Sequence, residues 1–418
     1  MVKVWIYAAI LIIISIIIMV RRQNILGIVL WLLYSVIGVF SVVCVQRGMF
    51  AMFLDTSIVP YIYLILTYSI SFFPFVHNKE LQSSKLKIEI PLQYYIFAVL
   101  YIFMALVTIR LYLPRVRELI SSGKWFKNIE DMYEGRIVFP YSNRVEYLCV
   151  QIVSYTRLLA LILGFSMLRE GKSFAHGLLL IGSAVSTALL TALNISSRGL
   201  VLNCFMLAFA FFLYFRKQYD RKIRIFAWIA LALGTITMIP VMSDITISRF
   251  TKNEASAALF RYFGQPPIVF SGGVSGITQY GYGVNGFGTF FNQRISQSDI
   301  GGSWGTGFYT FVGWIFLDWG PLGTIIVVSI ISWLLWKIMS KPEHEFSDLF
   351  LIFFVYYTLL QGVFVIGRSY CYQIIMAIVV YVFLKVFSDN REYYFGIYGD
   401  ELNIPKTKAK SKTCKYFK

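Results

Sequence analysis

Arginine side chains within long apolar segments are the residues of this sequence best suited to chemistry. Arg198 interrupts an apolar stretch that runs from Ser186 to Phe205, and Arg157 lies in the middle of YLCVQIVSYTRLLALILGFSML. A guanidinium group in hydrocarbon costs about 2.5 kcal/mol or more, so such a residue faces protein, water or a ligand. Its five N–H donors form a fixed fork that suits phosphate groups. We therefore treat these arginines as candidate anion-binding residues.

A polar stripe leads to Arg198 along the preceding apolar segment. Spacings of three and four residues place its members on one face of a helix that continues to residue 198. The stripe consists of Ser183, Thr187, Thr191, Asn194 and Arg198. One interpretation is that Arg198 binds an anionic group at the mouth of a polar cleft. The other is that the hydroxyl groups bond to neighbouring helices while Arg198 reaches lipid phosphate.

Arg157 lies too deep in its segment to reach the membrane surface easily. Gln151 and Ser154 precede it at a spacing of three residues, which indicates one polar helix face. The residue therefore faces a polar cavity or pairs with a carboxylate, and a structural and a substrate-binding role both remain open.

Residues 243–307 combine basic, aromatic and glycine residues. Arg249 and Arg261 supply positive charge, and aromatic rings of the kind that pack on the apolar faces of sugars are plentiful. The candidate sugar contacts are Tyr262, Tyr280 and Tyr282. The alternative is an ordinary ordered loop whose aromatic residues lie at the membrane interface.

The composition of the chain indicates that membrane-spanning helices position these residues. The chain has 418 residues, of which 58% are hydrophobic and 14% charged, and its mean hydropathy is +0.67. Repeated apolar runs predict an all-α polytopic membrane protein with about eleven spans in a single bundle over residues 1–388. The predicted spans are 3–20, 24–45, 58–76, 92–110, 147–168, 174–193, 199–215, 225–242, 308–337, 349–367 and 370–388.

The charges between these spans predict their orientation. The loop RKQYDRKIR and the tail 389–418 are strongly basic, and they fall on one side of the membrane if the number of spans is eleven. The positive-inside rule then places the N-terminus outside, the basic tail in the cytoplasm, and the long loops 111–146 and 243–307 outside. The net charge of +17 is explained by this pattern and by contacts with membrane lipids, so we expect no nucleic-acid partner.

The run 308–337 is too long for one untilted span and is interrupted by Asp318, Gly320 and Pro321. We expect a short piece that ends at Trp319 and a new helix that begins at Pro321. Asp318 is then expected near the helix start, in a capping contact.

Metal and cofactor chemistry have little support. The five cysteines and three histidines are scattered, and no phosphate-binding G-x-x-x-x-G-K-[ST] motif occurs. We therefore expect neither a metal site nor a cofactor.

The sequence resembles the Wzy family, the bacterial polymerases of oligosaccharide repeat units such as those of O-antigen and capsular polysaccharide. Three stretches carry the resemblance: SSRG with Arg198, YFGQPPIVFSGG after Arg249, and GTGFYTFVGWIFLDWGPLGTIIVV. It implies a GT-C-like, metal-independent membrane glycosyltransferase of the bacterial inner membrane. It also implies an undecaprenyl-diphosphate-linked oligosaccharide as substrate and a chain-length regulator protein as a partner.

The resemblance also implies roles for individual residues. Arginines would neutralise the charge that develops on the diphosphate leaving group, with Arg198, Arg249 and Arg261 as first candidates and Arg157 and Arg368 as second candidates. A carboxylate would act as general base towards the acceptor hydroxyl, and location alone makes Asp244, Glu254 and Asp299 the candidates.

Two other activities remain alternatives. The O-antigen ligase has a similar layout, but its large outer loop carries a histidine, and none of the histidines here is predicted outside. A flippase or another transporter of lipid-linked oligosaccharides is the second alternative, although transporters favour internal repeats and none is evident.

Overall fold

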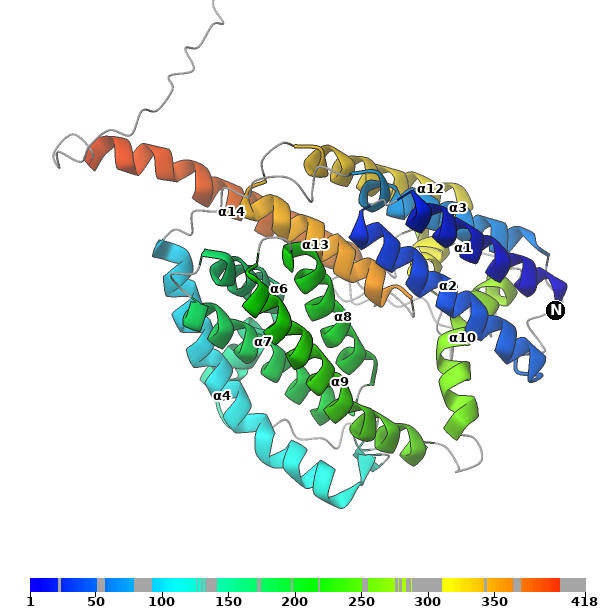
Figure 1. Ribbon diagram of the computed structural model, residues 1–418, viewed down its shortest axis with the longest axis horizontal. Coiled ribbons are helices and arrows are strands. Elements are labelled where there is room, and N and C mark those ends of the chain that lie inside the picture. Colours follow the sequence, from blue (N-terminus) through cyan, green and yellow to red (C-terminus); the bar gives the residue numbers. More distant parts are fainter. Residues whose placement is uncertain are drawn as a thin grey trace, which may run out of the picture.

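The computed structural model describes a protein built from helices (Figure 1). It covers residues 1–21, 24–50, 57–78, 92–125, 127–128, 131, 141–170, 174–196, 198–216, 219–249, 255–274, 277, 280–282, 287, 310–341, 344–363 and 370–398, and none of these lies in a strand. The helices are α1 (Val2–Val20), α2 (Ile25–Gln46), α3 (Val59–His77), α4 (Leu92–Ser122), α6 (Arg144–Glu170), α7 (Phe174–Asn194), α8 (Arg198–Phe215), α9 (Arg221–Arg249), α10 (Ala255–Val274), α12 (Val312–Met339), α13 (Phe346–Gln361) and α14 (Tyr370–Tyr398).

The architecture is that of an all-α polytopic membrane protein. Each predicted span overlaps one of these helices over its described residues, and eight of the helices are long and apolar enough to cross a membrane. Three more, within α8, α13 and α14, are apolar but shorter over their described residues. Large aliphatic side chains on α1, α4, α9 and α14 are exposed, as expected for surfaces that face lipid.

The helices form two groups, and α13 packs against members of both. One group contains α1, α2, α3, α10 and α12, and the other contains α4, α6, α7, α8 and α9 (Figure 1). α13 packs against α12 and α14 on one side and against α6 and α8 on the other. Phe353 of α13 contacts Phe211 of α8, with ring centroids 4.0 Å apart, so the two groups share one aromatic core.

The bundle has two ends, which we name after a buried residue at each. At the Asp318 end, the backbone N–H of Phe311 donates to the carbonyl of Gly362 over 2.6 Å, which joins the chain before α12 to the end of α13. At the His344 end, Asn24 caps α2 and also donates to the carbonyl of Asn78 after α3. Successive helices run in alternating directions. Most of them therefore begin near one of these two ends and finish near the other.

Helix occupies part of both predicted outer loops. α4 continues beyond residue 110 through Pro114 to Ser122, and α9 continues to Arg249. α10 lies entirely within the range 243–307 and packs against α2. At the contact, a Cβ on Gly264 would lie 2.5 Å from the carbonyl oxygen of Phe40, so only glycine allows the two backbones to approach this closely.

The expected break in α12 is confirmed. Gly320 has φ 67° and ψ −173°, which separates a helix that ends at Trp319 from one that begins at Pro321. The carbonyl of Leu317 would normally accept from the backbone N–H of residue 321, but proline has none. Gly281 takes that place and donates to the Leu317 carbonyl over 2.9 Å.

Candidate functional site

A polar network fixes the turn before Arg198. Asn128 donates to the carbonyl of Asn194 over 2.8 Å and to the Ser196 hydroxyl over 2.9 Å. Arg115 of α4 donates to the Asn128 Oδ1 atom over 2.9 Å. Ser196 is fully buried and adopts a left-handed φ of 50°, so the chain turns sharply between α7 and α8. Arg198 is consequently the first residue of α8, at the Asp318 end.

The expected continuous stripe is therefore broken. α7 ends at Asn194, and Arg198 belongs to the next helix, so the sequence interpretation of one helix through residue 198 is wrong. Within α7, Thr187 and Thr191 donate their hydroxyl protons to backbone carbonyls of the same helix. The protons of both hydroxyl groups are therefore used in hydrogen bonds within the helix. By contrast, the buried Oδ1 atom of Asn194 has no hydrogen-bond partner.

A small apolar cluster, which we call the end core, joins the helices around Arg198. Its residues come from the end of α4, the segment that follows it, and helices α7, α8 and α9: Val116, Leu119, Trp125, Ala192, Leu193, Val201 and Ile245. Val201 lies one helical turn after Arg198, and Ile245 lies one turn before Arg249. The end core thereby brings the helix ends that carry Arg198 and Arg249 together. Asp244 lies beside Ile245 on α9 with an exposed side chain.

Arg157 lies in the middle of α6 and lacks a partner for two of its nitrogen atoms. Its Nε and Nη2 atoms are buried and form no hydrogen bond. The guanidinium interacts electrostatically with Tyr101 of α4, Cys204 of α8 and Tyr357 of α13. Over the described part of the chain, no carboxylate pairs with it, so the ion-pair interpretation of Arg157 finds no partner among these residues.

Arg261 lies on α10, in the other helix group from Arg198 and Arg249. Its side chain is exposed, with the guanidinium carbon 5.5 Å from the centroid of the Phe50 ring. The same helix is fixed to α2 by Arg47, whose guanidinium lies 4.4 Å from the Phe260 ring centroid, and by the Ser41 hydroxyl, which donates to the Gly264 carbonyl. Arg261 therefore lies in a different region of the bundle from Arg198 and Arg249, and the three do not share one helix face.

A buried carboxylate that accepts a hydrogen bond from a tyrosine lies at the break in α12. Asp318 is fully buried, and its Oδ2 atom accepts from the Tyr370 hydroxyl over 2.9 Å. The Tyr370 hydroxyl in turn accepts from the Trp319 indole N–H over 2.9 Å. Sequence reasoning placed Asp318 here near the helix start, and in the structure its carboxylate receives this side-chain hydrogen bond from α14. Nothing in the sequence pattern linked Tyr370 to Asp318.

The predicted sugar-binding tyrosines differ in their surroundings. Tyr280 packs its ring over Gly320, where an added Cβ would lie 3.1 Å from the ring, so this side chain is part of the packing around the break. Tyr282 is 78% exposed, and its backbone N–H donates to the Asp318 carbonyl over 2.7 Å. Tyr282 therefore presents a free ring from a fixed backbone position.

Several predicted residues lie outside the described part of the structure. They are Glu254, Asp299 and Arg368. For Arg198, Arg249 and Tyr262 the structure describes the helical backbone but not the side chain. Their roles stay predictions.

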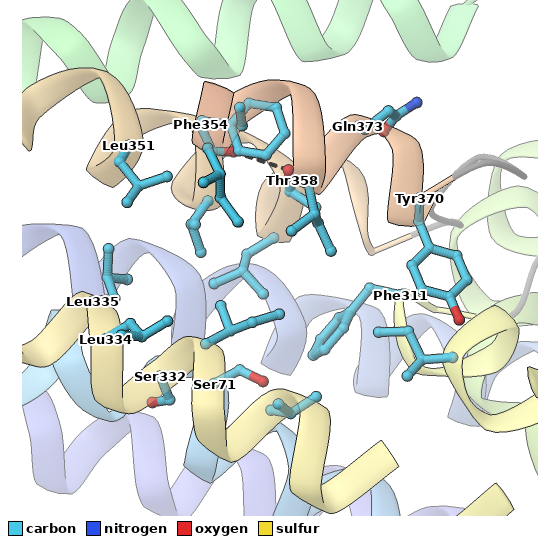
Figure 2. A pocket seen from close by; sticks show the side chains of 18 residues that line it. Ser71, Phe311, Ser332, Leu334, Leu335, Leu351, Phe354, Thr358, Tyr370 and Gln373 are labelled. Carbon is cyan, nitrogen blue, oxygen red and sulfur yellow. Dashed lines mark hydrogen bonds between the residues drawn. The ribbon is translucent and has the colours of Figure 1, made fainter. Parts of the chain in front are cut away.

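An apolar cavity of about 120 Å³ opens between α3, α12, α13 and α14 (Figure 2). Most of its lining is aliphatic, and its hydroxyl groups are already used: Thr358 donates to the Phe354 carbonyl and Ser71 to the Thr67 carbonyl. Tyr370, the partner of Asp318, borders the cavity. None of the predicted arginines lines it, so its chemistry is that of a hydrocarbon-binding surface and not of an anion site.

Sequence reasoning missed the residues that hold the site together. Asn128 follows a mixed-charge segment with no periodic pattern, and the tyrosines near Arg157 are hidden among 28 in the chain. Within the described residues, no cluster of histidine, cysteine and acidic side chains could hold a metal ion.

No family model, curated protein or solved structure matches this chain.

Proposed function

We propose that this protein is a membrane glycosyltransferase that joins undecaprenyl-diphosphate-linked oligosaccharide units into a longer glycan. The observation that carries the proposal is the end core, which brings the start of α8 and the end of α9 together at one end of an apolar bundle. Two arginines from different helices at such a site suit a diphosphate, whose charge grows as the glycan leaves it.

Other features of the Asp318 end suit the same substrate. Asp244 is exposed on the helix that carries Arg249, within one and a half turns of it, and can act as the general base, with Glu254 and Asp299 as the other candidates. Tyr282 offers a free ring to a sugar face. The apolar cavity beside Tyr370 suits the hydrocarbon chain of the lipid carrier. Arg261 would extend the positive surface towards α10.

In the proposed reaction, the acceptor hydroxyl loses its proton to the base as its oxygen bonds to the anomeric carbon of the donor glycan. The bond from that carbon to the diphosphate oxygen breaks, and the lipid diphosphate leaves with the electron pair. Arginine side chains stabilise the leaving group without being consumed.

The proposal is tested with purified protein and a synthetic lipid-diphosphate oligosaccharide. We expect products of two or more repeat units on one lipid. Arg198→Ala and Arg249→Ala should each lower the rate of lengthening by about 100-fold or more, which is the usual effect of removing one donor to a developing anion. The matched control is Arg224→Ala, which changes an exposed arginine at the opposite end of α9.

The product identifies the alternative if the proposal fails. Transfer of the glycan to a different lipid acceptor indicates a ligase, and movement of the substrate across a vesicle membrane without lengthening indicates a transporter. Unchanged lengthening by Arg198→Ala or Arg249→Ala removes that arginine from the site.

A further inference from the structure

The Arg157 guanidinium carries a positive charge with which no carboxylate among the described residues forms an ion pair. Its Nε and Nη2 atoms are buried and unbonded, although the residue as a whole is partly exposed. Removing a cation from water costs several kcal/mol unless hydrogen bonds and an opposite charge replace the lost solvation. An arginine with buried, unused donors in a membrane-spanning helix therefore points to a partner that is not part of the described chain.

The groups around Arg157 are neutral and can donate hydrogen bonds. Tyr101 is fully buried, and its hydroxyl lies near the guanidinium and near Thr187 but reaches hydrogen-bonding geometry with neither. Tyr357 of α13 and Cys204 of α8 also interact with the guanidinium electrostatically. The Tyr357 hydroxyl accepts from the Gln361 amide, so its own proton is free to donate to another group.

We propose that Arg157 and the hydroxyl groups near it form an intramembrane binding site for a phosphoryl group. A phosphoryl group has several acceptor oxygens, and Tyr101 of α4 and Tyr357 of α13, which both interact electrostatically with the guanidinium, can supply hydroxyl donors beside it. The guanidinium fork supplies two parallel donors, and a phosphoryl anion supplies the missing charge.

This site is separate from the proposed diphosphate site near Arg198. Cys204, which interacts electrostatically with Arg157, lies six residues after Arg198 on α8, which corresponds to about 9 Å along the helix axis. A phosphoryl group bound by Arg157 therefore lies deeper in the bundle than one bound at the helix start. The inference does not depend on the proposed reaction, because binding is measured without turnover.

Thermal unfolding of the full chain tests the proposal. We compare inorganic phosphate with dodecyl phosphate, using the Arg198→Ala/Arg249→Ala double variant so that the proposed diphosphate site does not contribute. At least one phosphate probe should raise the Tm, because a ligand that binds only the folded state stabilises it. Adding Arg157→Met should abolish that rise, while adding Arg224→Met, at the His344 end, should preserve it.

The two probes distinguish the source of the phosphoryl group. A rise with dodecyl phosphate alone indicates a lipid head group, and a rise with both probes indicates a site that also accepts free phosphate. No rise with either probe, or an equal rise when Arg157→Met is present, overturns the proposal.

A second variant keeps the test decisive if Arg157→Met does not fold. Tyr101→Phe removes one buried hydroxyl that has no partner, so it should not weaken folding. It should weaken probe binding by about tenfold, the effect of losing one hydrogen bond to a charged group. Unaltered affinity in Tyr101→Phe would contradict the arrangement proposed here.

Discussion

His344 is a titratable residue in a setting that opposes its charged form. It lies between α12 and α13, it is 1% exposed, and neither ring nitrogen has a hydrogen-bond partner. Burial lowers the pKa of His344, and the positive charge of Lys341 adds to this effect, while the carboxylate of Asp348 opposes it. The Lys341–Asp348 ion pair, at 2.8 Å, partly neutralises both neighbours.

This burial predicts a pH dependence of stability. The unfolded chain binds a proton at the ordinary histidine pKa of about 6.5, whereas the folded protein resists protonation to a lower pH. The stability that neutral His344 confers is thus complete above pH 6.5 and is lost as the pH falls through the folded pKa.

Tm measured from pH 8 to pH 5 should therefore fall for the natural protein and fall less for His344→Leu. His176→Leu is the control, because His176 is exposed. If the Tm curves of His344→Leu and the natural protein are parallel throughout, His344 does not control this dependence.

Single residues also show the limit of sequence reasoning about the site. The charge of Arg157 in an apolar run marked it as unusual, and its lack of an ion pair among the described residues agrees with one of the two interpretations made from sequence. The residues that interact with it electrostatically come from α4, α8 and α13, and no local spacing reveals which residues of separate helices meet. The left-handed Ser196 that ends the polar stripe is likewise set by a long-range contact, with Asn128.

The packing of α10 on α2 is the main element that the sequence did not predict. Its apolar stretch contains Pro266 and Pro267, which usually end a helix, and it lies within a glycine-rich segment. Contacts with α2 hold this helix: the Cys44 thiol and the Ser41 hydroxyl donate to the carbonyls of Phe260 and Gly264. By contrast, long apolar runs such as α1 and α2 were predicted to within a few residues, because the bilayer requires them.

Gly264 tests whether this contact holds α10 in place. Gly264→Ala adds a Cβ within 2.5 Å of the Phe40 carbonyl oxygen and 2.6 Å of the Cys44 sulphur. We expect a loss of about 1–3 kcal/mol of stability, measured as a lower Tm, since a well-packed contact must open to admit the methyl group. Gly182→Ala on α7 is the matched control, because a Cβ there meets no atom within 4 Å, and helix propensity alone should make it neutral or stabilising. An unchanged Tm in Gly264→Ala would show that α10 is free to shift.

At the scale of the whole molecule, the orientation in the membrane decides whether the proposed function is possible. The proposal requires the Asp318 end to face outwards and the His344 end to face the cytoplasm, as the positive-inside rule predicts. Tyr282 and Arg224 are exposed markers of the two ends. They can be replaced by cysteine in a chain from which the five natural cysteines have been removed.

A membrane-impermeant maleimide should label Tyr282→Cys in intact cells and Arg224→Cys only after the cells are opened. The reverse pattern would place the arginines of α8 and α9 in the cytoplasm. It would rule out a reaction on the outer leaflet, while leaving the binding test at Arg157 unaffected.

The proline at position 321 has a consequence for the long segment before α12. The backbone N–H groups of Gly281 and Tyr282 donate to the carbonyls of Leu317 and Asp318, so the segment before α12 is anchored to the bundle at these two residues. Insertions or deletions on the C-terminal side of this anchor should leave the position of the Tyr282 ring unchanged. The length of residues 283–309 is therefore open to engineering without displacing the aromatic residue that precedes them.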